Sequence, residues 1–234
     1  MVRRLRYVLA GGLVLATVAM PRVASADTIF TIGGGWFSPK AEDARVDGDV
    51  IVRNLNFLWF DPEDFDGGTV NGDLMFGLGR FAEVGVGAGY YQRTVPSVYA
   101  RSVHGDGTEI YQELKLRTAP MTATVRLFPA GRFGGFQPYV GGGIAVVYWR
   151  YSETGEWVDD TDDSIFRESY VDSGYAVGPV VFGGLRLPVS DAVLLGGEFR
   201  YQDAEGDLDP SLGFAGNKID VGGYSVTFTF GLRF

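Results

Sequence analysis

Hydrophobic and polar residues alternate with a period of two along almost the whole chain from residue 27 onward. In the last segment, the apolar positions from Tyr224 to Phe234 alternate with Ser225, Thr227 and other polar or small residues. This period is typical of β-strands with one apolar face, and no long segment shows the period of an amphipathic helix. Eight segments follow the pattern: residues 28–38, 72–79, 83–93, 110–128, 136–151, 175–187, 192–202 and 224–234. The sequence therefore predicts an all-β fold.

The connections between these segments alternate in length. Those after the second, fourth and sixth segments are short, at residues 80–82, 129–135 and 188–191. The other connections are long and acidic, and they include Asp61–Asp66 and Asp159–Asp163. Bacterial outer-membrane barrels sort their connections in this way. We therefore expect an eight-stranded antiparallel up-and-down transmembrane β-barrel with long external loops and short periplasmic turns. A soluble periplasmic sandwich is the alternative.

Residues 1–26 are typical of a secretory signal peptide. Arg3, Arg4 and Arg6 precede an apolar run from about residue 7 to residue 20, and small residues follow at 24–26. The apolar run is too short for a membrane-spanning helix, which needs about 20 residues. We therefore expect export, removal of residues 1–26, and a barrel domain at residues 27–234 in the bacterial outer membrane.

Two segments depart from the regular pattern. Val50 to Phe60 is a ninth strand-like segment, whereas single-chain bacterial barrels use an even number of strands. We therefore assign it to the first loop, as a protruding hairpin or as an extension of the second strand above the membrane. In the fourth strand the apolar parity switches between Leu116 and Met121, around Pro120. Because proline lacks a ladder donor, we expect a bulge or a bend there.

The polar parity of the strands faces the lumen of such a barrel. An eight-stranded barrel is just wide enough for side chains to fill, and unpaired buried charges are costly. We expect the charged residues of this parity to form salt bridges that close the lumen, and a charged constriction in a narrow conduit is the alternative. The predicted lumenal network is Asp73, Glu83, Arg93, Arg126, Arg186, Glu198 and Arg200. Glycines of the same parity make room for the arginine side chains.

Aromatic residues are also sorted along the strands. Tyrosine and tryptophan gather at the long-loop ends, where amphipathic rings suit the headgroup level of a membrane. The residues placed in this belt are Trp36, Tyr90, Tyr91, Tyr148, Trp149 and Tyr201, and phenylalanines lie near the short-turn ends at Phe81, Phe128, Phe136 and Phe234. This distribution favours the membrane barrel over the soluble sandwich.

With these features in place, the chain resembles the small bacterial outer-membrane β-barrel superfamily, which includes OmpA-type transmembrane domains and OmpX-like and OmpW-like proteins. The resemblance covers essentially the whole chain after residue 26, and it includes the segments Gln137–Gly143 and Phe228–Phe234. The closing segment resembles the signal that the barrel-assembly machinery recognises, carried by Phe228, Phe230, Leu232 and Phe234. The resemblance implies that outer-membrane lipid, lipopolysaccharide and, during biogenesis, this machinery are partners.

Composition restricts the function further. The formal net charge is −9. Removal of residues 1–26 would remove four arginines and no acidic residue, so the remaining chain would be more acidic still. An acidic surface argues against nucleic acid as a partner. The acidic run at Asp159–Asp163 lacks the regular spacing of a calcium loop. We assign no catalytic, cofactor-binding or metal-binding residues.

Three functions are weighed. The leading hypothesis is a non-enzymatic, monomeric barrel with a side-chain-filled lumen, which acts through its surface loops or in envelope integrity. The alternative is a narrow channel for small solutes or apolar molecules, with a route near Pro120 or Pro179. The second alternative is a lipid-A-modifying enzyme around His104, the single histidine of the chain, with Ser102 and Asp106 nearby.

Overall fold

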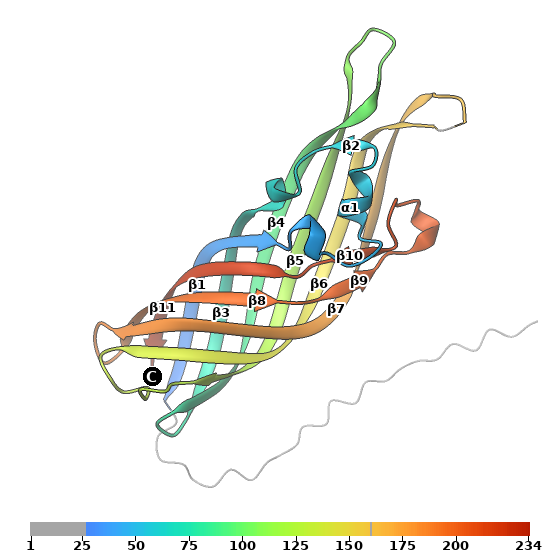
Figure 1. Ribbon diagram of the computed structural model, residues 1–234. Coiled ribbons are helices and arrows are strands. Elements are labelled where there is room, and N and C mark those ends of the chain that lie inside the picture. The colour runs from blue at the N-terminus through green and yellow to red at the C-terminus, as the bar shows by residue number, and fades with distance from the viewer. Residues whose placement is uncertain (1–26, 160) are drawn as a thin grey trace, which may run out of the picture.

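The computed structural model describes residues 27–159 and 161–234, so the predicted signal peptide at residues 1–26 lies outside the described residues. Eight antiparallel strands form one closed ring (Figure 1). The strands of the ring are β1 (Thr28–Pro39), β3 (Gly67–Leu78), β4 (Ala82–Val103), β5 (Glu109–Leu127), β6 (Gln137–Val158), β7 (Ile165–Pro188), β8 (Val193–Gln202) and β11 (Gly223–Arg233).

The first and last strands close the ring. Strand β1 pairs with β3 on one side and with β11 on the other, where Ile32 lies opposite Phe230. Every other strand of the ring pairs with its neighbours in chain order. This up-and-down order confirms the predicted eight-stranded barrel. Closure matters because an open sheet edge inside a bilayer would leave amide and carbonyl groups without partners.

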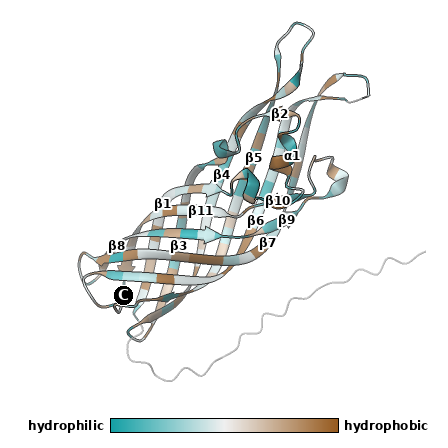
Figure 2. Cartoon of the chain, in the orientation of Figure 1, coloured by the Kyte–Doolittle hydropathy of each residue, from teal (hydrophilic) through white to brown (hydrophobic). Residues whose placement is uncertain are grey.

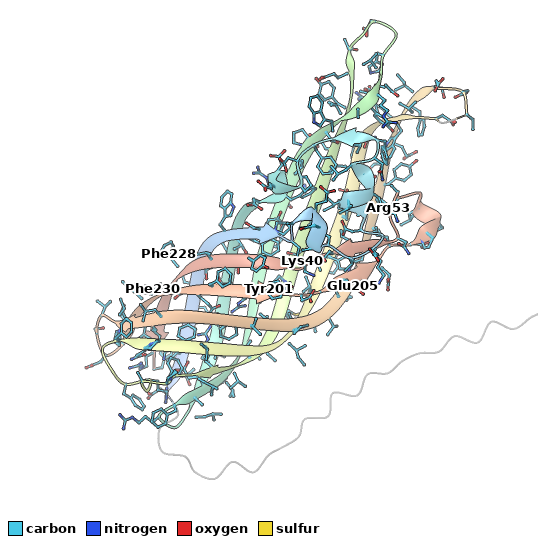
Figure 3. The ribbon with its side chains drawn as sticks, in the orientation of Figure 1. Lys40, Arg53, Tyr201, Glu205, Phe228 and Phe230 are labelled. Atoms are coloured by element: carbon cyan, nitrogen blue, oxygen red, sulfur yellow. The ribbon has the colours of Figure 1, made fainter. Side chains whose placement is uncertain are left out.

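Side chains alternate between the outer wall and the interior. In β6, the exposed fractions of Val140 and Ile144 are 55% and 60%, whereas Val147 is fully buried. Figure 2 shows apolar and polar positions alternating along the lower strands. On β11, Phe228 and Phe230 point away from the barrel (Figure 3). An outer wall of exposed aliphatic and aromatic side chains fits hydrocarbon rather than water.

Strands β4 to β7 continue beyond the other strands and form two hairpins at the end opposite the C-terminus (Figure 1). Strand β7 has 24 residues, whereas a barrel strand needs about 9–11 residues to cross a membrane. The sequence pattern predicted shorter strands, such as residues 83–93 and 175–187. Beyond the apolar part of the outer wall, apolar and polar residues no longer alternate strictly, although the ladder of backbone hydrogen bonds continues.

The segment Val50 to Phe60 lies in the first long connection, as expected, but its predicted form was wrong. Val50–Asn54 is a short helix, α1, and Leu58–Trp59 is a short strand, β2, which pairs with β4. The Asp49 carboxylate caps the helix by accepting hydrogen bonds from two amides of its first turn. Five residues are too few to show a helical period, which is why the sequence pattern missed this helix.

The remaining elements lie in the long connections. Among the residues that the structure describes, no helix is long and apolar enough to cross a membrane. The short elements are the 3-10 turns η1 (Glu42–Ala44), η2 (Pro62–Phe65) and η3 (Pro210–Leu212), and the strands β9 (Glu205–Asp207) and β10 (Lys218–Asp220), which pair with each other.

The predicted bulge at Pro120 was also wrong. Strand β5 keeps one register with β4 on both sides of Pro120 and an unbroken register with β6, and the register shift of the β4–β5 pair lies between Val98 and Val103 instead. Even-numbered residues of β5 point inward throughout, from Leu116, which is fully buried, to Arg126. The apolar parity switches because the interior changes from polar to apolar at this level.

Candidate functional site

The lower interior, toward the short turns, contains an ion pair with two parallel hydrogen bonds. Arg186 contacts both carboxylate oxygens of Glu83, at 2.8 and 3.1 Å, and donates from Nε to Gln137 at 2.8 Å. All three side chains are almost completely buried. A planar guanidinium held by two charge-assisted bonds has one orientation, so this cluster is rigid.

A second cluster lies farther up the interior. Arg126 lies 3.3 Å from Asp73 and 3.1 Å from Glu198, and Arg200 lies 2.8 Å from Glu198 and 3.6 Å from Asp73. The Tyr139 hydroxyl donates a hydrogen bond to Glu198 at 3.0 Å. Each carboxylate therefore faces two cations. Removing one partner from a buried pair costs about 3–5 kcal/mol, so the cluster resists opening.

The structure thus brings together six of the seven side chains of the predicted network and places Arg93 apart from them. Arg93 is exposed and donates from Nε to the backbone carbonyl of Asp64 at 2.8 Å. Arg132 of the β5–β6 turn occupies the interior instead, 3.5 Å from Glu83 and 3.4 Å from Asp27. Strand parity could not identify Arg132, because a turn has no parity. Its signal in the sequence was an isolated cation within a short turn.

Small residues and aromatic rings fit around the guanidinium groups. A side chain at Gly77 would collide with the guanidinium of Arg132, so glycine at this inward position makes room for the cation. The guanidinium of Arg186 lies 4.6 Å from the ring centroid of Phe128, which is buried inside the barrel. Such cation–π contacts stabilise cations that are removed from water.

The upper interior, toward the long connections, is apolar. Leu114 and Leu116 of β5 pack in one cluster with Val147 of β6 and with Ile51 and Phe65 of the first connection. Each of these side chains is at most 1% exposed. The first connection therefore folds back into the barrel mouth and fills it. We call the segment 40–66, which includes α1, β2 and η2, the mouth plug.

Two residues of the predicted aromatic belt belong to this cluster. Tyr91 and Trp149 are 2% and 1% exposed, so their assignment to the outer belt was wrong. Both lie on the inward parity of their strands, whereas Tyr90 and Tyr148 follow the outward parity. Neighbouring aromatic residues on one strand necessarily point to opposite faces.

Polar contacts fasten the mouth plug to the last long connection. The Asp49 carboxylate binds Arg45 at 2.8 Å and accepts a hydrogen bond from the backbone amide of Asp220 at 2.6 Å. Lys40, which Figure 3 labels near the mouth, lies 2.5 Å from Asp203 and 3.0 Å from Asp220. Burial disfavours the charged ammonium of Lys40, but its bonds to the two carboxylates outweigh burial and raise its pKa. The first and last connections are thus joined by a buried ion pair between Lys40 and Asp220 and by a partly exposed one between Lys40 and Asp203.

One further contact attaches helix α1 to the barrel wall. The Asn54 amide donates hydrogen bonds to Glu153 at 2.5 Å and to the Tyr151 hydroxyl at 3.1 Å. Burial raises the pKa of Glu153, and the hydrogen bonds only partly offset this effect. The protonated form of Glu153 is therefore favoured more than in water, and it suits the apolar surroundings.

A small cavity separates the polar and apolar layers. Its volume is about 50 Å³, and its lining includes Tyr91, Thr118, Pro120, Thr122 and Arg200. A cavity of this size holds a few water molecules and no larger solute. Side chains therefore fill the interior on both sides of this cavity, in an ionic layer below and an apolar layer above.

The residues around His104 are not arranged as a catalytic triad. The His104 ring bonds Glu156 of β6 at 2.9 Å, which lowers the pKa of Glu156. Asp106 accepts hydrogen bonds from the backbone and side chain of Thr108, and these bonds lower its pKa. In the described part of the chain, no hydrogen bond joins His104 to Ser102 or Asp106. His104 also lies near the tip of the β4–β5 hairpin, far along the strand from the apolar wall.

A model of one protein family, described as outer membrane protein beta-barrel domain, matches residues 10–234. The chain belongs to this family. Membership places the barrel in the bacterial outer membrane, with its apolar wall in contact with lipid. A search of curated proteins gives no match.

Solved structures share the fold of the barrel at low sequence identity. OprG from Pseudomonas aeruginosa has a TM-score of 0.53 and 15% identity, over 90% of this chain and 96% of OprG. A major outer membrane protein from Thermus thermophilus has a TM-score of 0.47 and 14% identity, over 90% of this chain and 100% of that one. Escherichia coli outer membrane protein W has a TM-score of 0.44 and 15% identity, over 91% of this chain and 100% of that one. The likeness to OprG concerns the fold alone.

Substitution of Asp49 tests the attachment of the mouth plug. Asp49→Ala removes the helix cap and leaves the buried Arg45 without its carboxylate, so we expect the free energy of unfolding to fall by about 3–5 kcal/mol. The measurement is denaturant unfolding of the reconstituted barrel, together with protease cleavage within residues 40–66. Asp47→Ala is the matched control, because Asp47 is exposed. Equal stability and equal protease resistance of the two variants would contradict the proposed attachment.

Proposed function

We propose that this protein is a non-enzymatic outer-membrane barrel that does not conduct and that acts at the cell surface through its two long hairpins. The observation that carries the proposal is the contrast between a filled interior and an extended, ordered exterior. Two ionic clusters and the mouth plug occupy the lumen, and the cavity of about 50 Å³ between these layers is too small for a solute. Contacts with other molecules therefore fall to the external surface.

The length of the hairpins supports this role. Strands β6 and β7 remain paired up to Val158 and Ile165, and their 22 and 24 residues are at least twice the number of about 9–11 that a membrane crossing requires. The ladder of backbone hydrogen bonds continues through this excess length. Such hairpins present side chains at a fixed distance from the membrane.

Contacts between the hairpins make their arrangement more rigid. His104 of the β4–β5 hairpin binds Glu156 of β6, and the Gln112 side chain donates to the backbone carbonyl of Glu156 at 3.0 Å. Within the β6–β7 hairpin, Trp157 packs edge-on against Tyr170, with ring centroids 4.6 Å apart. A surface with these cross-links has less conformational freedom to lose when it binds a partner.

Shortening both hairpins tests the surface role. Residues 99–110 and 155–168 are replaced by two-residue turns, which join the paired positions Val98 with Tyr111 and Thr154 with Ser169. We expect an intact barrel, whose boiled and unboiled samples still migrate differently on gels. We expect cells that express this variant to lose most of their adhesion to glass and to host-cell surfaces. The control is the full-length protein at the same surface density. Unchanged adhesion, or no adhesion by the full-length protein, would count against the proposal.

A narrow conduit for small apolar molecules is the second candidate. It is favoured by the apolar upper interior and by Pro120, which lines the cavity and lacks a backbone donor. The size of the cavity disfavours it, because an apolar molecule would have to displace the mouth plug.

Recordings in planar bilayers test whether the lumen is open to ions. We expect no conductance steps from the wild-type barrel, since the ionic clusters fill the lumen. Reproducible steps that change in Arg126→Ala or Arg186→Ala, but not in the control Arg167→Ala on the exposed hairpin, would show an open lumen and contradict the closed barrel.

A further inference from the structure

Three cations gather on the outer wall of β5 and β6, at Lys115, Arg117 and Arg150. Strand register places Arg117 directly opposite Arg150, and Lys115 opposite Ser152. All three follow the outward parity of their strands, and together with Ser152 they line a shallow hollow. We call these three residues the basic cluster. It lies outside the barrel, so it is separate from the arginines that fill the lumen.

Within the described part of the chain, the basic cluster has no protein counterion. Among the residues that the structure describes, none of its three members forms a salt bridge, and Arg117 donates from Nε to the neutral Gln92 at 3.0 Å. Like charges directly opposite each other in a sheet are destabilising. An external anion would offset the repulsion between Arg117 and Arg150.

The position of the cluster identifies the source of the anion. Ala119, Tyr148 and Tyr175 form one row across β5, β6 and β7, and the rings of the two tyrosines lie 5.5 Å apart. Arg117 and Arg150 occupy the next outward row, about 7 Å farther along the strands. Tyrosines mark the headgroup level of a membrane, so the basic cluster lies at the level of lipid phosphates.

The wall below this tyrosine row fits acyl chains. An apolar hollow lies there on the outer face, with Met121, Ile144, Val146 and Val86 among its lining residues. Met121 and Ile144 are 52% and 60% exposed, and they face away from the lumen. The outer wall therefore presents cations above and an apolar surface below, which is the order of phosphate and acyl chains in a lipid.

We propose that Lys115, Arg117 and Arg150 bind the phosphate of a phosphorylated glycolipid in the outer leaflet, whose acyl chains lie on the apolar wall below. Guanidinium groups suit phosphate because they donate two parallel hydrogen bonds to its oxygens, and the lysine adds a third cation. The Ser152 hydroxyl lies in the same hollow and supplies a further donor. This site does not depend on the role of the hairpins, which extend beyond it.

The test uses the full barrel in neutral detergent micelles, titrated with bis-phosphorylated lipid A and followed by native mass spectrometry. We expect Arg117→Gln/Arg150→Gln to lower the affinity about tenfold, since two charge-assisted contacts to phosphate are lost. The control Arg53→Gln/Arg101→Gln removes the same charge from exposed positions elsewhere and leaves the affinity unchanged. Dephosphorylated lipid A should bind the wild type and both variants equally weakly.

Two further measurements keep the result unambiguous. First, without anionic lipid, the Arg117→Gln/Arg150→Gln variant should melt at the same temperature as the wild type or at a higher one, because the repulsion between the opposed charges is gone. Second, added lipid A should raise the melting temperature of the wild type more than that of this variant. Equal affinities of wild type and variant for bis-phosphorylated lipid A would overturn the proposal. So would complete competition by millimolar inorganic phosphate, which would show a site for free phosphate rather than for a lipid.

Discussion

Backbone hydrogen bonding around a closed ring is the constraint on which this structure depends. Hydrocarbon offers no partner to a free amide or carbonyl group, so the seam between β1 and β11 has to be paired like every other strand boundary. Closure also separates two environments. Outward side chains meet lipid, and inward side chains have to fill a space that neither lipid nor bulk water occupies.

The chain fills that space in two different ways. Toward the short turns, carboxylates such as Glu198 are each held between guanidinium groups. Toward the long connections, apolar side chains of β5 and β6 enclose a segment of the first connection, and Asp49 fastens this segment to the far side of the mouth. Together the two layers fill the lumen with side chains.

The ring itself could be predicted from the sequence, because a period of two and alternating connection lengths are direct consequences of a barrel in a membrane. The same period predicted that Asp73 and Arg126 face the lumen, and both side chains are buried there. Predictions from the period failed at two places where it carries no information. Arg132 lies in a turn, and α1 is too short to show a helical period. The period also misled at Trp149, because an apolar residue on the inward face resembles a belt residue until the interior is known to be apolar.

The most direct test of this account measures the environment of successive residues along β6. The chain has no cysteine, so single-cysteine variants at positions 140–154 can carry a spin label, and its accessibility to oxygen and to a water-soluble nickel complex can be compared in bilayers. The account predicts oxygen access alone at 140, 144 and 146, nickel access at 150 and above on the same parity, and protection from both at 145 and 147. Nickel access at Val140 and Ile144, or at the inward positions, would contradict a lipid-embedded barrel with a closed interior.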